Sequence, residues 1–280
     1  VNRNNYEIGF FFFCNKIRVA KAYLHMWEEP CISGCNGSGT IFFSGCNLRC
    51  LFCQNYYISE LNNGREISTL EFANICIDLQ NRGANNINLV TPTHYVPLII
   101  EGIKKAKQLG LNIPIVYNSS GYEKVDTIKL LEGIVDVYLP DFKYFDNMYA
   151  MKYSKCKDYF DYTDKAIEEM FRQKPKCIFD EKGNIISGVI VRHLILPDRK
   201  DDSKQVLKHL FLKYKNNIFY SIMNQYTPVR KCIYEELNKK VSMDDYDEVI
   251  NYAWDMGIRN AFVQEEGTVS ESFIPDFCEK

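Results

Sequence analysis

Apolar residues occur in short continuous runs, separated by turn residues, along most of the chain. Runs that are apolar at every position are typical of strands in a parallel sheet that is covered on both faces. We predict such strands at residues 41–43, 87–90, 113–117, 134–139, 189–196, 218–223 and 261–263.

Segments with a helical pattern lie between these runs, and several of them have recognisable ends. Ser68-Thr-Leu-Glu71 has the spacing of a capping box, in which the serine hydroxyl and the glutamate carboxylate each accept a bond from a backbone N–H. Gly83 suits the left-handed conformation that ends a helix, so we predict a helix between Ser68 and Gly83. Further helices are predicted at 95–109, 123–132, 203–215 and 242–256.

The alternation of strands and helices implies right-handed crossovers and a parallel sheet. After residue 40 there are about six strand–helix units, fewer than the eight of a closed barrel. We therefore predict an α/β fold, a partial and open parallel β/α barrel at 41–280, preceded by a separate N-terminal extension at 1–40. A doubly wound open sheet remains the alternative, because the strand pattern does not separate the two. Within the extension, residues 8–14 lack the basic lead-in and cleavage site of a signal peptide and predict a strand.

Composition and charge exclude several classes of protein. With 46% hydrophobic and 14% aromatic residues, the chain can bury a large core and is not disordered. The 34 basic and 36 acidic residues leave a net charge of −2, which argues against a nucleic-acid partner. No apolar run approaches the ~20 residues that cross a bilayer, so no membrane association is expected. Because the chain starts with valine, we expect that some N-terminal sequence precedes it.

The 11 cysteines are unevenly distributed. An odd number in a chain of this length fits poorly with a disulfide scaffold. Five of them gather in one short stretch: Cys31, Cys35, Cys46, Cys50 and Cys53. This cluster of thiols indicates a metal site in a reducing compartment, and we expect a cytoplasmic protein. Isolated cysteines within helical patterns are expected to be ordinary buried thiols.

Three of these cysteines follow the first predicted strand of the barrel with the spacing Cys46-x-x-x-Cys50-x-x-Cys53. Thiolates are soft ligands that favour iron–sulfur clusters or zinc. Three ligands leave one iron of a cubic cluster open to a non-protein ligand, as in a catalytic site. A fourth ligand from Cys31 or Cys35 would instead give a closed electron-transfer cluster or a structural zinc site. The spacing favours the open cluster and leaves the other two possible.

This loop, directly after the first strand of a partial barrel, resembles the signature of the radical S-adenosylmethionine (SAM) superfamily. Further segments are similar to the group related to pyruvate formate-lyase activating enzyme: 27–34, 37–43, 86–95, 114–122, 138–144 and 191–197. The resemblance implies a [4Fe–4S] cluster on the three cysteines, with SAM chelating the open iron. It further implies reductive cleavage of SAM and hydrogen abstraction from a peptide, protein or small-molecule substrate by a 5′-deoxyadenosyl radical. An external one-electron donor such as flavodoxin or ferredoxin is then expected.

The resemblance also implies residues that contact SAM. Asp141 and Lys143 follow the end of a strand, and Lys143 is suited to pair with the SAM carboxylate. Phe52 matches a position beside the adenine, and Asn118 and Ser119, at the end of the third strand, are suited to bond the ribose or methionine groups of SAM. The structural alternatives are a surface salt bridge for Asp141 and Lys143, loop packing for Phe52, and turn chemistry for Asn118 and Ser119.

Strand 189–196 contains two polar residues that alternate between its faces. Arg192, if buried, requires an anionic partner, which is either the SAM carboxylate or an acidic residue of a neighbouring strand. His193 fits a hydrogen-bonded core histidine better than a catalyst. Gln225 and Tyr226 follow strand 218–223. These two residues and His193 are the candidate catalytic residues, and the sequence assigns no chemical step to any of them.

The chain departs from this family at one motif and leaves other segments unassigned. Many relatives bind the SAM amino group with Gly-Gly-Glu, where this chain has Thr91, Thr93 and His94 as possible replacements. For a second metal site only Cys14, Cys31 and Cys35 are available, and buried thiols are the better interpretation. The five tyrosines of residues 144–162 either line a substrate entrance or pack a helix.

Overall fold

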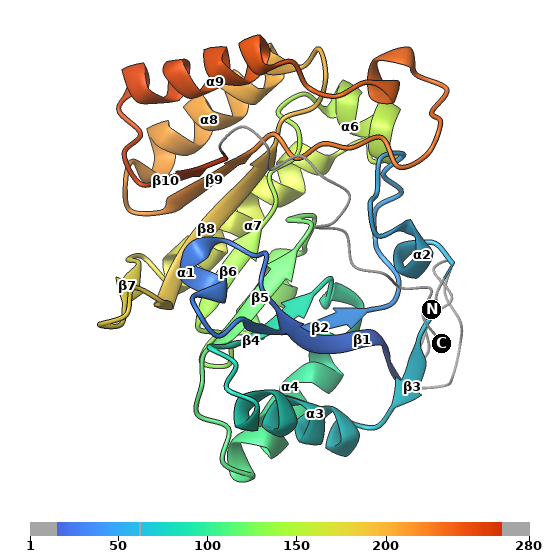
Figure 1. The fold of residues 1–280 in the computed structure, drawn as a ribbon, viewed down its shortest axis with the longest axis vertical. Coiled ribbons are helices and arrows are strands. Elements are labelled where there is room, and N and C mark those ends of the chain that lie inside the picture. Colours follow the sequence, from blue (N-terminus) through green and yellow to red (C-terminus); the bar gives the residue numbers. More distant parts are fainter. Residues whose placement is uncertain (1–15, 62, 265–280) are drawn as a thin grey trace.

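The computed structural model describes residues 16–61 and 63–264, so the strand predicted at 8–14 and Cys14 lie outside the described residues. Its centre is a ten-stranded sheet (Figure 1). The strands are β1 (Ile17–His25), β2 (Ser38–Phe43), β3 (Arg65–Ile67), β4 (Ile87–Val90), β5 (Ile115–Ser119), β6 (Val137–Pro140), β7 (Ile178–Phe179), β8 (Ile185–Leu194), β9 (Phe219–Met223) and β10 (Ala261–Val263).

The order of the strands distinguishes the two predicted architectures. Hydrogen-bonded neighbours follow the path β10-β9-β8-β6-β5-β4-β2-β1-β3, and β7 pairs with β8. From β2 to β10 all neighbouring pairs on this path are parallel, and they follow one another in chain order. A doubly wound sheet reverses its order at a switch point, which this sheet does not. β10 and β3, at the two ends of the path, do not pair with each other in the described part of the chain, so the prediction of an open partial barrel is confirmed.

Helices connect the parallel strands, as predicted from the alternating pattern. They are α1 (Pro30–Ser33), α2 (Tyr56–Ser59), α3 (Thr69–Asn81), α4 (Val96–Gln108), α5 (Val125–Lys129), α6 (Asn147–Ser154), α7 (Tyr159–Gln173), α8 (Lys200–Tyr214) and α9 (Met243–Met256), with 3₁₀ turns η2 (Thr93–Tyr95) and η3 (Glu235–Asn238). The capping box is formed: Ser68 Oγ accepts from the Glu71 N–H at 3.2 Å, and Glu71 accepts from the Ser68 N–H at 2.8 Å. Gly83, with a φ of +92°, follows the end of α3 as predicted.

The predicted boundary at residues 40 and 41 falls inside β2. β1 lies within the predicted N-terminal extension, but it pairs antiparallel with β2 from Val19 to His25 and also with β3. β1 and the start of β2 are therefore part of the sheet, although they precede the predicted boundary. Nothing in the sequence pattern marked β1 as a strand, because polar residues interrupt it.

The two faces of the sheet are covered differently. On β6, Tyr138 belongs to the large core that also contains Ile167 and Met170 of α7, whereas the neighbouring Val137 packs with Ile32 of α1. Successive residues of a strand point to opposite faces, so α1 and α7 cover opposite sides. In Figure 1, α1 lies in front of β6 and β8, with α7 behind them. The short α1 therefore fills the inner side of the open barrel.

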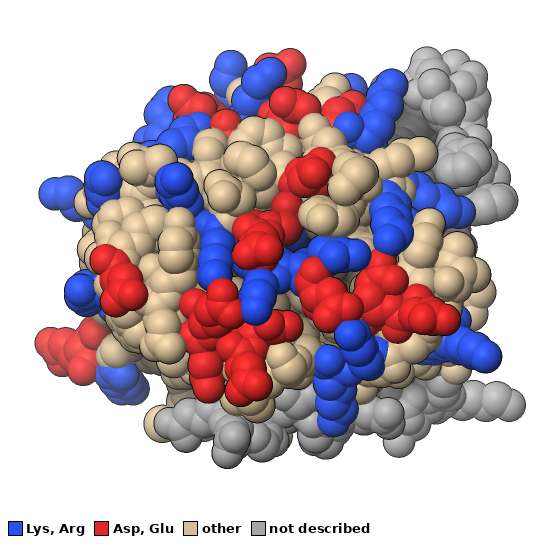
Figure 2. Space-filling model, turned by 90° about the horizontal axis from the view of Figure 1, so that it is seen from above, with Lys and Arg blue, Asp and Glu red and all other residues tan. Residues whose placement is uncertain are grey.

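The outer surface carries mixed charges where α8 and α9 lie. In Figure 2 basic and acidic side chains are interspersed over this face, and no large basic patch is visible on it. Ion pairs link the two helices, with Lys200 and Lys204 each 2.6 Å from a carboxylate oxygen of Glu248. None of the helices within the described ranges combines the length and apolar composition needed to span a membrane.

Candidate metal centre and cofactor pocket

The three-cysteine loop follows β2 and is held by backbone hydrogen bonds to distant segments. The Leu51 N–H donates to the Tyr153 carbonyl at 2.8 Å, and the Arg49 N–H donates to the Ser154 carbonyl at 3.2 Å, both in α6. From the segment after β9, Arg230 donates to the Leu51 carbonyl at 3.0 Å. These contacts fix the loop before any cofactor is bound.

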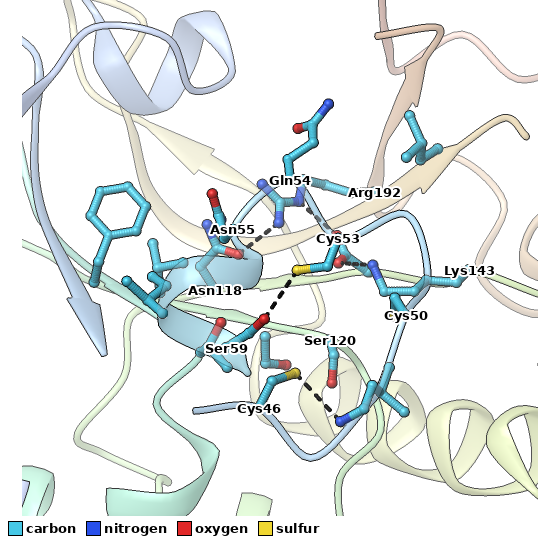
Figure 3. Close-up of a pocket in the computed structure, with 18 of the residues that line it drawn as sticks. Cys46, Cys50, Cys53, Gln54, Asn55, Ser59, Asn118, Ser120, Lys143 and Arg192 are labelled. Carbon is cyan, nitrogen blue, oxygen red and sulfur yellow. Dashed lines mark hydrogen bonds and ion pairs between the residues drawn. The ribbon is translucent and has the colours of Figure 1, made fainter. Parts of the chain in front are cut away.

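The loop forms one wall of a cavity of about 240 Å³ at the carboxyl ends of the parallel strands. All three cysteines line it, as Figure 3 shows, together with residues from the ends of β4, β5, β6, β8 and β9. Ligands bind at this end of the strands in parallel α/β folds. The predicted metal ligands and the predicted cofactor contacts therefore meet at one place.

Each thiol has its own polar neighbour. Cys50 Sγ accepts a hydrogen bond from Ser154 Oγ at 3.0 Å, and that hydroxyl lies 2.6 Å from Tyr144 Oη. Cys53 Sγ lies 3.3 Å from Ser59 Oγ, and Cys46 Sγ accepts from the Leu48 N–H at 3.4 Å. Hydrogen bonds to sulfur tune the potential of iron–sulfur clusters.

The chemistry of the three thiols fits a cationic metal cluster. Burial, followed by the negative charges of Cys50 and Cys53, raises the pKa of Cys46 to about 12. Burial likewise raises the pKa of Cys50 to about 11, although the Lys143 charge opposes the increase. Metal ligation requires thiolates, and the iron of a cluster would add to the Lys143 charge in stabilising them.

The thiols are close together but not yet arranged around one centre. Within residues 16–61 and 63–264, no three His, Cys, Asp or Glu side chains stand in a group that holds a metal ion. Assembly of a cluster therefore requires the side chains to turn toward a common centre. Rotation about one side-chain bond per cysteine is a small change.

Cys31 and Cys35 are not among the residues that line this cavity. Cys31 is buried in the inner core beside Ile32, as expected, whereas Cys35 is exposed, so the expectation of a buried thiol is wrong there. Cys35 follows α1 at the surface, where the helix has already ended. A closed four-cysteine cluster or zinc site therefore lacks its proposed fourth ligand at this position.

A buried network of charges forms the opposite wall. Asp141 accepts from Arg192 Nε at 2.9 Å and pairs with Lys143 Nζ at 2.5 Å, and all three side chains are more than four-fifths buried. Arg192 also donates to Asn118 Oδ1 at 2.7 Å and lies 3.4 Å from a carboxylate oxygen of Glu28. Burial acts to raise the pKa of Asp141, but the charges of Arg192 and Lys143 outweigh it and hold this pKa below its usual value.

Strand register explains this network. Asp141 and Arg192 are bridge partners across β6 and β8, and Arg192 pairs with Ser221 of β9. Partners in a parallel sheet point to the same face, so these side chains enter the barrel together. The alternative that Arg192 has an acidic partner on a neighbouring strand is thus realised in the structure. Lys143 retains further donor hydrogens for an anionic ligand.

The remaining predicted contacts divide into two groups. Phe52, Asn118, Ser119 and Gln225 line the cavity. His193 does not, because it faces the other side of β8, where its Nδ1 lies 2.7 Å from the Phe142 carbonyl. Tyr226 is also absent from the lining; its hydroxyl donates to the Leu237 carbonyl at 2.6 Å. His193 and Tyr226 therefore lie outside the lining of this cavity, and the Tyr226 ring packs 6.0 Å from that of Phe52.

The tyrosine-rich segment 144–162 forms α6 and the beginning of α7. Tyr144, Tyr153 and Tyr159 are almost completely buried and pack beside Cys50 in a secondary core. None of the five tyrosines lines the cysteine cavity. They therefore pack the helices that support the loop.

Of the three possible replacements for Gly-Gly-Glu, only Thr91 lines the cysteine cavity. Thr93 donates to Glu123 at 2.6 Å and, with His94, lines a different cavity. Thr91 has a φ of +59°, a conformation that favours glycine and that a β-branched residue adopts only at a cost of about 1–3 kcal/mol. Strain of this kind is concentrated at functional sites.

The Thr91→Gly variant is expected to be more stable by about 1 kcal/mol, because relief of strain exceeds the entropy that glycine loses on folding. If the Thr91 side chain contacts SAM, the affinity for SAM falls in the same variant. Chemical denaturation and equilibrium binding of SAM to the reconstituted protein measure the two effects. Lys155→Gly is the control, since Lys155 is also left-handed (φ +53°) but lies outside the cavity. An equal loss of SAM affinity in Lys155→Gly would contradict a role for the Thr91 side chain.

Some cavity residues had no predicted role. Trp27 and Glu28 come from the link between β1 and α1, and Gln54 and Ser120 from loops. The 27–34 segment did carry the family resemblance, but without a strand or helix pattern its position could not be inferred.

An open parallel barrel with three cysteines at the carboxyl end of its first parallel strand defines a radical SAM type of enzyme. The profile of the Radical SAM superfamily matches residues 40–210. This chain belongs to the radical SAM superfamily, whose members use a [4Fe–4S] cluster and SAM for radical catalysis.

Comparison with known proteins gives one sequence relative and several similar folds. The chain is 32% identical over 241 residues to the uncharacterized protein MJ0674 of Methanocaldococcus jannaschii, covering 82% of this chain and 65% of that protein. SuiB of Streptococcus suis, solved with S-adenosylmethionine, has a TM-score of 0.51 at 13% identity over 75% of this chain and 45% of SuiB. The FeFe-hydrogenase maturase HydG of Carboxydothermus hydrogenoformans has a TM-score of 0.50 at 12% identity, over 76% of this chain and 50% of HydG. The chain thus spans less than two thirds of the length of each.

Proposed function

We propose that this chain binds a [4Fe–4S] cluster through Cys46, Cys50 and Cys53 and abstracts hydrogen from a peptide, protein or small-molecule substrate. An activating-enzyme-like role, in which the substrate is a protein, is one form of this proposal. The observation that carries it is the convergence of the three thiols, Lys143 and Asn118 on one cavity. SuiB, a protein of the same fold, has been solved with its precursor peptide, which is in keeping with a peptide substrate.

In this proposal each part of the cavity has a separate task. The cluster, when bound, supplies the electron that cleaves SAM to a 5′-deoxyadenosyl radical. Lys143 binds the SAM carboxylate, and Asp141 holds the lysine in place through their 2.5 Å pair. Phe52 packs at the adenine, and Asn118 and Ser119 bond to the polar groups of SAM. The walls exclude water, which protects a radical from side reactions.

The direct test is reductive cleavage of SAM. Anaerobically reconstituted protein, given SAM and dithionite, is expected to release 5′-deoxyadenosine, because uncoupled cleavage needs no knowledge of the substrate. The product is measured by liquid chromatography, with a reaction lacking reductant as the control. Flavodoxin or ferredoxin with its reductase replaces dithionite to test the proposed external donor. No product from a fully loaded cluster with any of these reductants would contradict the proposal.

The proposal also includes a cytoplasmic location, because cysteines that must stay reduced to ligate a cluster are expected in a reducing compartment.

A further inference from the structure

A second cavity of about 490 Å³ adjoins the first inside the barrel. The two share lining residues: Trp27, Glu28, Arg192, Met223 and Gln225. The second cavity extends from this shared wall between the β1–α1 link and strands β9 and β10. A molecule held there lies directly beside the proposed SAM site.

Glu29 lines only this second cavity. It is 8% exposed, and the Ser221 hydroxyl bonds to its carboxylate. Its other oxygen, Oε2, is buried and has no hydrogen-bond partner among the residues that the structure describes. Such an atom is costly to bury and is expected to have a partner in the functional complex.

The charges around Glu29 do not balance. Asp141 and Glu28 are both within ion-pair distance of Arg192, and Lys143 is paired with Asp141. Glu29 is thus a third carboxylate beside two cations. Burial raises its pKa, although the Arg192 charge opposes this rise, so the Arg192 charge alone does not offset the desolvation of an ionised Glu29 and a second cation is needed to favour the charged form. A further positive charge would complete the set.

The rest of the cavity is suited to an apolar stem. Met223, Ala261, Phe262 and Val263 contribute hydrophobic surface, and the Trp27 side chain is 62% exposed. Aromatic rings also attract organic cations through their faces. The cavity thus combines apolar surface with a buried carboxylate that has one unpartnered oxygen, and this combination suits an alkylammonium or alkylguanidinium group.

We propose that Glu29 binds a positively charged group of the substrate, a primary ammonium or a guanidinium carried on an apolar stem. This inference rests on the proposed function, because it assigns the substrate class for hydrogen abstraction at the same barrel. A divalent metal is a poorer occupant, since Ca²⁺ takes six to eight oxygen ligands and no acidic trio is grouped for a metal within the described residues. The cation belongs either to a lysine or arginine side chain of a peptide or to a free amine.

Three probes test the charge and its source. N-acetyl-lysine amide carries an ammonium, N-acetyl-norleucine amide has a similar apolar stem without one, and pentylamine has the ammonium without peptide groups. Each is titrated into the reconstituted, SAM-loaded protein, and binding is measured by calorimetry. We expect the lysine probe to bind at least about tenfold more tightly than the norleucine probe, since charge-assisted bonds to a buried carboxylate are strong. Tighter binding of the lysine probe than of pentylamine would identify a peptide as the source, and the reverse a free amine.

Glu29→Gln keeps the shape of the side chain and removes its charge. In this variant the preference for the lysine probe over the norleucine probe should fall to about twofold or less, whereas Glu181→Gln, a change at an exposed loop glutamate, should preserve it. Cluster content and thermal stability without probe show whether each variant is folded, and Glu29→Asp, which retains the charge, should recover part of the preference. Equal binding of charged and neutral probes to the wild-type protein, or an unchanged preference in Glu29→Gln, would overturn the proposal. Because these readouts do not depend on SAM cleavage, a failure of the proposed function is recognised separately.

Discussion

The Cys50→Ala variant is expected to lose the iron–sulfur cluster and to release 5′-deoxyadenosine at least about 100-fold more slowly than the wild-type protein. Substitution of a residue that only supports a metal ligand lowers metal affinity or activity about 10–100-fold, so removal of a ligand itself is expected to have at least this effect. Cys50 is the thiol bonded by Ser154 and enclosed by the α6 core, which makes replacement by solvent difficult. Iron and sulfide content after reconstitution, with the rate of SAM cleavage, measure the result.

Cys35→Ala is the matched control, because Cys35 is an exposed thiol outside the cavity. It should keep full cluster content and activity. Loss of the cluster in Cys35→Ala, or retention of it in Cys50→Ala, would favour a closed four-cysteine site over ligation by three residues.

The Asp141→Asn variant should lower the free energy of unfolding by about 3–5 kcal/mol. The substitution leaves Arg192 and Lys143 facing each other without the carboxylate between them, and removing one partner of a buried ion pair costs about this much. Affinity for SAM is expected to fall as well, since Asp141 positions Lys143. Denaturant unfolding of the protein without cluster isolates the effect on stability.

The pH dependence of this difference follows from the pKa of Asp141, which is lowered in the folded protein. A lowered pKa stabilises the fold above the pKa of the unfolded chain, about 4, and this contribution is lost as the pH falls through the folded value. The wild-type advantage over Asp141→Asn should therefore be constant near pH 7 and shrink below about pH 4. Glu101→Gln, at an exposed helix pair with Lys105, should have little effect at either pH. An equal loss in both variants would show that burial does not strengthen the Asp141 network.

A strand was predictable from the sequence where its own residues carried the pattern of a buried strand. β4, β5 and β6 are buried at every position, and their largely apolar residues leave a clear signal in the sequence. β1 was not predicted, since it is a partly exposed strand with an irregular pattern of burial. The helix α8 begins at Lys200 rather than at the predicted residue 203, and since no side chain caps its first turn the sequence carried no signal for this start.

The same contrast applies to the site. The spacing of the three cysteines predicted a common loop, and the position of Asp141 and Lys143 after a strand predicted the correct edge of the sheet. Their roles as cluster ligands and SAM contacts stay predictions. Glu28 and Glu29 were not predicted as cavity residues, since they lie in an irregular link whose path into the barrel depends on the packing of α1.

The sequence by itself determined the class of this protein, because a parallel sheet and a cysteine loop leave local patterns that need only neighbouring residues to be recognised. Only the tertiary structure decided which side chains share the interior of the barrel. The register of β6, β8 and β9 brings Asp141, Arg192 and Ser221 to one face of the sheet, beside the cavity that the buried Glu29 lines. Long-range pairing of this kind is set by the packing of whole elements, which no local pattern records.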